Sequence, residues 1–229
     1  PIKHGYYIYD LQHIDLPHLF SELEYEKREI AFKKIIDSGK PILVNSQHAH
    51  RRIYETYSLD PELIVSLPLQ VTSKYSDLTG QDVKKCKVKT DSHSRYFCVS
   101  NQFWEHKNHL ILFQAMKELV KEYKVNLICT GKLEDYRSPE YVKSLQKFIT
   151  ENALDNDIKF LGIIPKNDQL ELMRKATAVI QPSQYEGGPG GGSGFDALCV
   201  GATLIASDID VNRELSLYSK NVTYFKSGS

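Results

Sequence analysis

Two acidic residues flank a glycine-rich segment near the end of this 229-residue sequence. Glu186 comes directly before the segment from Gly187 to Gly194, in which six of the eight residues are glycine, and Asp196 follows it. Glycine loses much backbone entropy on folding and supplies no side chain for packing, so stability alone seldom explains such a run. Glycine does permit positive φ angles and close approach of a ligand to the backbone. A flexible surface loop is the alternative interpretation.

An apolar segment of helical character, Phe195 to Val200, follows the glycines, and a short β-like run comes next, Thr203 to Ala206. A helix that begins directly after a glycine loop directs its free N–H groups and its positive dipole end at one place. That arrangement suits a phosphate group. Glu186 and Asp196 can accept hydrogen bonds from hydroxyl groups beside it. The segment therefore predicts a site for a ligand that carries both phosphate and hydroxyl groups.

The composition is that of an ordinary globular protein, with 41% hydrophobic and 25% charged residues. The 29 Lys and Arg residues balance the 29 Asp and Glu residues, which argues against a nucleic-acid partner. No apolar run is long enough to span a bilayer and no signal peptide is visible, so we expect a cytoplasmic protein. Because the first residue is Pro1 and not Met, we expect the chain to be a piece of a longer protein.

Cysteine and histidine residues give little sign of a metal site. The cysteines are single, with no Cys-x-x-Cys pair, and we expect them to be reduced and buried: Cys86, Cys98, Cys129 and Cys199. Four histidines lack a nearby cysteine or paired carboxylate, which argues against zinc: His48, His50, His106 and His109. Asp208 and Asp210 form an Asp-x-Asp sequence, which we interpret as a turn and not as a metal site.

The second half of the chain alternates strand-like and helical segments. Strands are predicted at 96–99, 125–129, 158–161, 177–180 and 203–206. The helices between them are predicted to present apolar faces, the first through Leu112 to Tyr123, and the second capped by Ser138; a further helix is expected near Glu214. This alternation predicts a doubly wound parallel sheet, whose ligands bind beyond the carboxyl ends of the strands.

The first part of the chain predicts a smaller α/β layer. Strands are expected at 6–9, 42–44 and 64–67, with helices at 19–36 and 48–57. We divide the chain into a partial N-terminal domain (1–70), a linker (71–93) and a C-terminal domain (94–229). The linker holds a basic run from Lys84 to Lys89, which we interpret as solvated, with a membrane-surface or phosphate patch as the alternative.

The residues now resemble a known family. Four segments carry the resemblance, in this order: SNQFWEHKNH at 100–109, FLG at 160–162, and then VIQPSQYEGG and FDALCVGATLIASD. Together they are similar to the family-4 retaining glycosyltransferases of the GT-B fold. The resemblance covers nearly all of the chain from Tyr96 to Glu214. The segment from Tyr6 to Leu67, with DLQH at 10–13, resembles the second half of the family's N-terminal domain. The resemblance as a whole implies a GT-B-like α/β fold.

The resemblance also implies roles for single residues. Lys107 stands where the family has a lysine that binds the donor diphosphate, and Gln102 replaces a phosphate-binding arginine. Glu186 corresponds to the first acid of the E-x7-E motif, which contacts the donor sugar. Asp196 corresponds to the second, which holds the ribose, although nine residues separate the two acids here. The resemblance places backbone close to the donor at Gly131, Gly187, Gly188, Gly190, Gly191, Gly192, Ser193 and Gly194.

Two residues near the start belong to a segment that, in the family, faces the donor across the interdomain cleft. These are Asp10 and His13, which the resemblance makes catalytic candidates together with Glu186. The alternative interpretation is an aspartate at a strand end and a surface histidine. Trp104 is expected to lie in a loop near the cleft.

The resemblance implies transfer of a sugar, with retention, from a nucleotide diphosphate sugar to an acceptor hydroxyl in polysaccharide biosynthesis. The acceptor would be a saccharide, free, lipid-linked or protein-linked, and peripheral membrane contact is compatible with that. Neither a metal nor a cofactor is expected. Two alternatives stay open: a nucleotide-sugar epimerase of GT-B architecture, and a non-catalytic nucleotide-sugar-binding module. The replaced arginine at Gln102 and the shorter acid at Asp196 are compatible with the second alternative.

Overall fold

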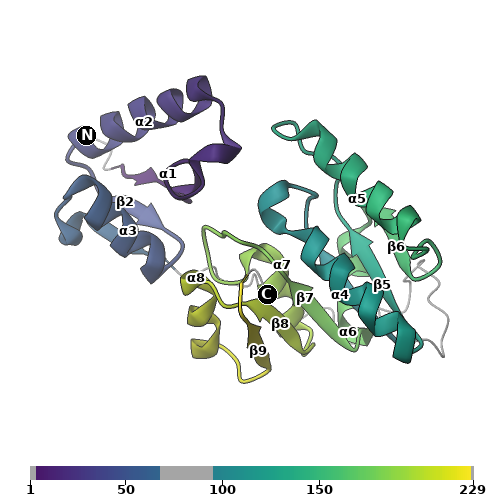
Figure 1. Ribbon diagram of the computed structural model, residues 1–229. Helices are drawn as coiled ribbons and strands as arrows, with labels where there is room; N and C mark the ends of the chain where they lie inside the picture. The colour runs from purple at the N-terminus through teal and green to yellow at the C-terminus, as the bar shows by residue number, and fades with distance from the viewer. Residues whose placement is uncertain (1–3, 68–94, 228–229) are drawn as a thin grey trace.

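The computed structural model describes residues 4–67 and 95–227, which form two parallel β-sheets with helices around them (Figure 1). Within the described residues the N-terminal sheet has three strands in the order β1-β2-β3. Its elements, where η marks a 3-10 turn, are β1 (Tyr6–Tyr7), α1 (Gln12–Asp15), η1 (Pro17–Leu19), α2 (Glu22–Asp37), β2 (Ile42–Val44), α3 (Gln47–Tyr57), η2 (Pro61–Leu63) and β3 (Ile64–Ser66).

The C-terminal sheet has six parallel strands among the described residues, in the order β6-β5-β4-β7-β8-β9. Its elements are β4 (Arg95–Ser100), η5 (Glu105–Lys107), α4 (His109–Glu122), β5 (Val125–Thr130), α5 (Pro139–Glu151), β6 (Ile158–Gly162), α6 (Lys166–Lys175), β7 (Ala178–Gln181), α7 (Gly191–Cys199), β8 (Leu204–Ser207), α8 (Asp210–Arg213), η6 (Glu214–Leu217) and β9 (Val222–Phe225). The predicted doubly wound parallel sheet is confirmed.

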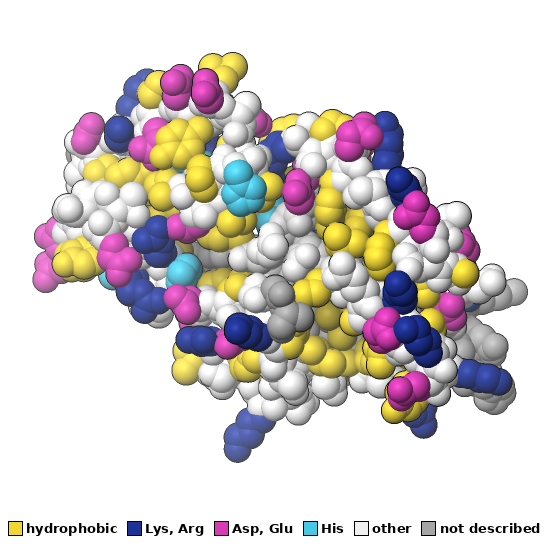
Figure 2. Space-filling model, viewed as in Figure 1, with side chains coloured by type: hydrophobic (Ala, Val, Ile, Leu, Met, Phe, Trp, Pro, Cys, Tyr) yellow, Lys and Arg dark blue, Asp and Glu magenta, His cyan; other side chains and the backbone are white. Residues whose placement is uncertain are grey.

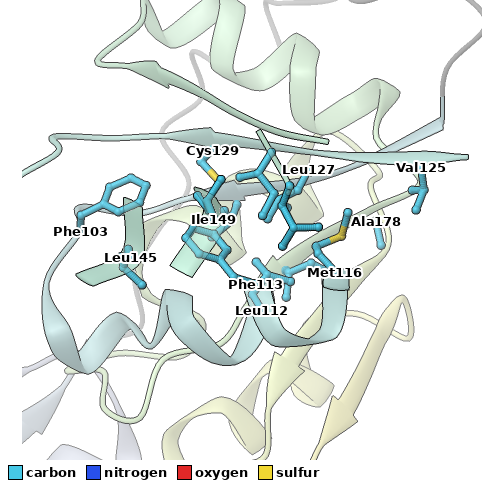
Figure 3. Packing of buried hydrophobic residues seen from close by; sticks show 14 residues of the cluster. Phe103, Leu112, Phe113, Met116, Val125, Leu127, Cys129, Leu145, Ile149 and Ala178 are labelled. Atoms are coloured by element: carbon cyan, nitrogen blue, oxygen red, sulfur yellow. The ribbon is translucent and has the colours of Figure 1, made fainter. Parts of the chain in front are cut away.

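Helices α4 and α5 cover one face of the C-terminal sheet. Phe113 and Met116 of α4 and Leu145 of α5 are fully buried in one cluster with Leu127 and Cys129 of β5 (Figure 3). Burying one such large apolar side chain stabilises the fold by roughly 1.5–3 kcal/mol. This cluster therefore holds the central strands in place, and with them the loops that leave their carboxyl ends.

Helices α6 and α7 cover the opposite face. Cys98 of β4 points into this second cluster, whereas its neighbour Val99 points toward α4, as the alternation of a strand requires. Met173 of α6, Ala197 of α7 and Leu204 of β8 are fully buried there. Both faces of the sheet are thus covered, which is the usual condition for a parallel sheet.

The order of the strands creates a crevice between β4 and β7. Strand β4 pairs with β5 on one side and with β7 on the other, and the chain passes through β5 and β6 before it returns to β7. The connections of such neighbouring strands leave in opposite directions, so a crevice opens at their carboxyl ends. Ser100 ends β4 and Gln181 ends β7, and the segments that follow them carry the predicted site.

Several predicted element boundaries need correction. Helix α7 begins at Gly191 and not at Phe195, because the glycines themselves form helical hydrogen bonds: the Gly194 N–H donates to the Gly190 carbonyl at 2.9 Å. Strand β1 ends at Tyr7 and not at Tyr9, since the chain then turns toward the glycine segment. Strand β9 was not predicted, although its Val-Thr-Tyr-Phe sequence is typical of a strand.

Three side chains lie in other environments than we expected. Tyr123 is 59% exposed, because α4 ends at Glu122 and the backbone is extended at the tyrosine. Cys199 is exposed at the last position of α7. The Ser138 side chain makes no capping hydrogen bond to α5; its backbone oxygen accepts from the Tyr141 N–H instead.

Some expectations fall on residues that the structure does not describe. The predicted linker at 71–93, its basic run and Cys86 lie outside the described residues, so the domain boundaries stay predictions. None of the helices in the described ranges combines the length and the apolar character that crossing a bilayer requires.

Besides the hydrogen bond from Arg137 Nη1 to Gln12 Oε1, two groups of hydrogen bonds join the N-terminal part to the C-terminal part among the described residues. At the first, the Leu11 N–H donates to the Tyr185 hydroxyl at 2.9 Å and the Ser46 hydroxyl donates to the Gly187 carbonyl at 3.3 Å. At the second, the Glu214 carboxylate accepts from the first two backbone N–H groups of α3, at 3.1 and 2.7 Å. The glycine segment is thus part of the contact between the two sheets.

Candidate functional site

The site begins with two amide side chains at the crevice between β4 and β7. Asn101 follows β4, and its Nδ2 donates to Oε1 of Gln181, the last residue of β7. Gln181 is fully buried, and its Nε2 donates to the Gly190 carbonyl at 2.7 Å and to Glu186 Oε1 at 3.1 Å. Sequence reasoning missed both residues. Their only signal is a polar side chain directly at the carboxyl end of a buried strand.

Lys107 and Glu186 form the charged centre of the site. Lys107 Nζ donates to Glu186 Oε1 at 2.6 Å, and the two side chains are only 15% and 7% exposed. Lys107 ends η5, and Glu186 lies in the segment after β7. Removing one partner of such a buried pair would leave an uncompensated charge, which costs several kcal/mol, about 3–5. The structure therefore brings together two of the residues that the sequence predicted, 79 positions apart.

The glycine segment folds around this pair. Gly190 and Gly191 have φ angles of 64° and 55°, which side-chain-bearing residues rarely adopt. A Cβ atom on Gly191 would lie 2.7 Å from Glu186 Oε2, whereas a Cβ atom on Gly192 would have nothing within 4 Å. Gly191 is thus needed for the close packing of the Glu186 carboxylate against α7. Gly192 leaves an open place at the start of the helix.

A buried asparagine fixes the start of α7 from the other side. The Gly190 N–H donates to Asn212 Oδ1 at 2.8 Å, and Asn212 Nδ2 donates to the Ser207 carbonyl at 3.0 Å. Asn212 is fully buried and belongs to α8. Together with Gln181 it leaves the glycine segment little conformational freedom. The interpretation of a flexible surface loop is therefore wrong, because side chains from two other elements bind this backbone.

Asp196 and Ser193 both lie inside α7. Asp196 is its sixth residue, whereas the predicted helical segment from Phe195 would place it near the start. Its carboxylate forms an ion pair with Lys166, the first residue of α6. Ser193 lies one turn earlier, and its hydroxyl donates to Asn101 Oδ1 at 3.1 Å.

The remaining glycine candidates have structural contacts. Gly131 has a φ of 131°, and a Cβ atom there would lie 2.0 Å from the Asn101 carbonyl oxygen, so it allows two loops to pack closely. A Cβ atom on Gly187 would lie 2.2 Å from the Tyr9 carbonyl oxygen. The buried Gly188 accepts the Gly191 N–H at 3.0 Å. Gln102, at the place of the family's arginine, is exposed.

The structure separates the two candidates of the N-terminal part. Asp10 lies beside Gly187, and its carboxylate pairs with Arg28. His13 is fully buried, so the interpretation of a surface histidine is wrong, and its ring packs against three aromatic rings, Phe20, Tyr25 and Phe32. Its Nε2 lies 3.0 Å from Glu29 Oε1, and burial lowers the pKa of His13. Among the described residues, the hydrogen bond and the ring contacts of His13 all lie within the N-terminal part.

Metal-binding groups are not brought together here. Within the described residues, no group of three or more His, Cys, Asp or Glu side chains is placed to hold a metal ion. Asp208 accepts from Arg213 at 2.7 and 3.1 Å, and Asp210 lies 3.7 Å from the same guanidinium. The predicted turn needs correction, because Asp210 is the first residue of α8. The His109 ring stacks on Phe103 with 4.1 Å between ring centres, inside the core.

Two buried histidines next to Lys107 predict a loss of stability in acid. Burial, and then the Lys107 charge, lower the pKa of His106 to about 2 and that of His109 to about 3. Because these folded-state pKa values lie below the usual 6.5, the unfolded chain binds more protons at low pH. The stabilising contribution is therefore complete above about pH 6.5 and is lost as the pH falls. Between pH 6.5 and 5 we expect about 2 kcal/mol per histidine.

Urea unfolding at pH 7 and at pH 5 measures this loss. The variant His109→Phe keeps a ring between the same aromatic neighbours and should show a shallower dependence on pH. The control His18→Phe changes an exposed histidine and should leave the dependence as it is. Equal slopes for the wild type and His109→Phe would contradict the prediction.

The comparison with known protein families agrees with this geometry. Residues 81–225, well over half of the chain, match the family described as Glycosyl transferases group 1. The chain belongs to this family of glycosyltransferases. Its matched region runs from before β4 to the end of β9 and contains Lys107, Glu186 and the whole glycine segment.

Two curated relatives are similar to this glycosyltransferase chain. The O-antigen chain mannosyltransferase RfbU of Salmonella typhimurium is 25% identical over 208 residues, which are 91% of this chain and 53% of the relative. The capsular polysaccharide biosynthesis glycosyltransferase CapH of Staphylococcus aureus is 23% identical over 163 residues, 70% of this chain and 44% of the relative. The chain therefore spans about half the length of the curated relatives that it matches.

Solved glycosyltransferase structures share the fold. HepE of Anabaena, determined with UDP and glucose, has a TM-score of 0.77 at 20% identity. The match covers 98% of this chain and 58% of the HepE chain. WaaG, a glycosyltransferase involved in lipopolysaccharide biosynthesis, has a TM-score of 0.72 at 13% identity; the match covers 98% of this chain and 61% of the WaaG chain. At these identities the likeness concerns the fold, and it confirms the predicted GT-B architecture.

Proposed function

We propose that this glycosyltransferase binds a nucleotide diphosphate sugar at the glycine segment and transfers the sugar, with retention, to an acceptor hydroxyl, as the family-4 enzymes do. The observation that carries the proposal is the pairing of Lys107 with Glu186 at the start of α7. A cation, a carboxylate and a helix N-terminus then lie within one small volume. The cation and the helix N-terminus suit a diphosphate, and the carboxylate suits a sugar hydroxyl.

The start of α7 supplies donors for phosphate oxygens. The Gly191 N–H donates to the Gly188 carbonyl and the Gly194 N–H to the Gly190 carbonyl. Between them, the N–H groups of Gly192 and Ser193 have no backbone partner among the described residues, as expected in the first turn of a helix. Gly192 is also exposed. These donors and Lys107 would stabilise the charge that develops on the leaving diphosphate.

Glu186 would bind the sugar. When a diphosphate takes over the Lys107 ammonium, the Glu186 carboxylate loses its strongest partner and keeps the hydrogen bond from Gln181. It can then accept hydrogen bonds from sugar hydroxyl groups. Asp10 lies beside Gly187 and is the second candidate to contact the sugar. We keep Asp196 as the candidate for the ribose, in exchange for its present partner Lys166.

Experiments with nucleotide sugars separate this function from its alternatives. Incubating the full chain with UDP-sugars and GDP-sugars, with and without saccharide acceptors, should release the nucleoside diphosphate. NMR of the product should show the anomeric configuration of the donor. Conversion of the nucleotide sugar into its epimer would indicate an epimerase. Binding without turnover would indicate the non-catalytic module, which the exposed Gln102 and the Asp196–Lys166 pair favour.

We expect turnover to survive metal chelation. The charge of the diphosphate can be met by Lys107 and by the N–H groups of α7, and both Asp208 and Asp210 are already paired with Arg213. Nucleoside diphosphate release should therefore be nearly the same in EDTA and in magnesium or manganese. Asp208→Asn serves as the matched variant and should keep full turnover. A complete loss in EDTA that magnesium restores would contradict the prediction.

A further inference from the structure

An arginine with unused hydrogen-bond donors lies where the N-terminal part meets the loop after β5. The guanidinium carbon of Arg137 lies 4.6 Å from the ring centre of Phe20 and 4.8 Å from that of Trp104. Its Nη1 donates to Gln12 Oε1 at 3.3 Å, and its Nε is buried with no partner among the described residues. Two aromatic faces therefore hold the guanidinium in place, while most of its five N–H donors stay unused.

Two cavities lie against this guanidinium, in the region where the surface is hollowed between the two parts of the molecule (Figure 2). The first has a volume of about 330 Å³ and the second of about 450 Å³, and Arg137 lines both. The charged residues that line the first cavity are three cations and two carboxylates: Lys27, Arg28, Arg137, Asp10 and Glu24.

Both carboxylates of the first cavity already have partners. Asp10 pairs with Arg28, and Glu24 accepts from the Ser21 N–H at 3.2 Å and the Ser21 hydroxyl at 2.8 Å. The Ser21 hydrogen bonds, and more weakly the nearby Arg137 charge, lower the pKa of Glu24. For Lys27 and Arg137 the described residues provide no ion pair. The first cavity thus has positive charge that an anion can neutralise.

The second cavity has a different lining. Three residues contribute carboxylates, Glu105, Asp135 and the Glu24 that also lines the first cavity. The Asp135 carboxylate is fixed by the backbone N–H groups of Glu105 at 2.9 Å and Arg137 at 3.0 Å. The Tyr136 side chain is 67% exposed at its edge. Carboxylates that accept hydrogen bonds and an exposed aromatic ring suit the hydroxyl groups and the apolar face of a sugar.

We infer that these two cavities bind an acidic acceptor saccharide, and that Arg137 holds its oxyanion, a carboxylate or a phosphate. The inference rests on the proposed function, because it assigns the acceptor of the same reaction. A guanidinium that is already fixed between two rings loses little entropy on binding and presents a fork that matches both oxyanions. The acid-lined second cavity would hold the hydroxyl groups of the sugar.

The position of η5 places this group next to the donor. Trp104 precedes η5 and faces Arg137, and Lys107 ends η5 and faces Glu186. A 3-10 turn rises about 2 Å per residue, so the two backbone positions are only about 6 Å apart along the turn. An acceptor on Arg137 and a diphosphate on Lys107 would therefore meet on opposite sides of one short turn.

Fluorescence of Trp104 tests the inference directly, because it is the only tryptophan in the sequence and it contacts Arg137. We expect glucuronate and glucose 6-phosphate to change its emission in a saturable way, and neutral glucose to bind at least about 10-fold more weakly. Arg137→Gln should weaken the binding of the anionic sugars about 10- to 100-fold, and Arg137→Lys, which keeps the charge but loses the fork, by less. Tighter binding of glucuronate would identify a carboxylate as the natural acidic group, and tighter binding of glucose 6-phosphate would identify a phosphate.

Controls separate this inference from the proposed function. Arg213→Gln removes an exposed guanidinium elsewhere and should bind both sugars like the wild type. In calorimetry, Lys107→Ala should lose affinity for UDP and keep its affinity for glucuronate. Arg137→Gln should keep its affinity for UDP and lose affinity for glucuronate. Unchanged sugar binding in Arg137→Gln, equal binding of glucose and glucuronate, or loss of UDP binding in Arg137→Gln would each overturn the inference. A failure of both UDP and GDP to bind the wild type would overturn the proposed function alone.

Discussion

Replacing Lys107 with alanine is expected to weaken the binding of a nucleoside diphosphate about 10- to 100-fold. The ammonium lies in a largely buried position at the start of α7, where its charge is poorly screened by water. A charge-assisted hydrogen bond contributes about 1.5–3 kcal/mol, which corresponds to this loss. Calorimetric titration with UDP measures it. The matched control is Lys143→Ala, which removes an exposed lysine that also pairs with a glutamate, Glu140 on α5.

The same substitution leaves Glu186 buried without its cation, so a loss of stability must be kept apart from a loss of binding. The double variant Lys107→Ala/Glu186→Gln removes both charges and should recover most of the stability in urea unfolding. It should not recover the affinity for UDP, because the cation is still absent. Full recovery of UDP binding in the double variant, or unchanged affinity in Lys107→Ala, would show that Lys107 does not bind the diphosphate.

Alanine at Gly191 and alanine at Gly192 are expected to have opposite effects. At Gly191 the φ of 55° and a Cβ atom 2.7 Å from the Glu186 carboxylate should destabilise the fold by about 1–2 kcal/mol and displace the carboxylate. At Gly192 the Cβ atom meets nothing within 4 Å, and alanine favours a helix by up to about 1 kcal/mol, so stability should stay equal or rise. Thermal unfolding of both variants measures this difference.

Ligand binding by the same two variants tests the open place at the start of α7. If phosphate oxygens approach the Gly192 backbone, a methyl group there should reduce UDP affinity at least about 10-fold while the protein stays stable. Gly191→Ala should also lose turnover, since it moves Glu186. A Gly192→Ala variant that binds UDP like the wild type would place the diphosphate elsewhere.

Local sequence patterns were sufficient to predict the architecture, and the family resemblance singled out Lys107 and Glu186, although not their pairing. The buried strands are rich in apolar residues, and Glu186 is conspicuous beside its glycines, whereas Lys107 has no glycine near it in the sequence. Gln181 and Asn212 could not be predicted in the same way, because a single amide at the end of an element has no pattern around it. Their importance comes from the carbonyl and N–H of Gly190, to which they bind in space.

Other misses have non-local causes as well. The burial of His13 depends on rings that α2 and the segment before it place around it, and nothing near the histidine in the sequence indicates them. The early start of α7 was missed because glycine usually disfavours helices. Here the backbone of Gly190 is fixed by Asn212, and two positive φ angles let the first turn form within the glycines.

The carboxylate of Glu214 has a consequence for the stiffness of the molecule. It completes the first turn of α3 from the other sheet, where the Gln47 and His48 N–H groups have no helical partner of their own. A motion that parts the two sheets would leave these two N–H groups to water, whereas the Ser46 hydroxyl would still cap α3 by accepting from the Ala49 N–H at 2.9 Å. Parting the two sheets therefore costs two charge-assisted hydrogen bonds, so the Glu214 carboxylate favours the closed arrangement of the two parts.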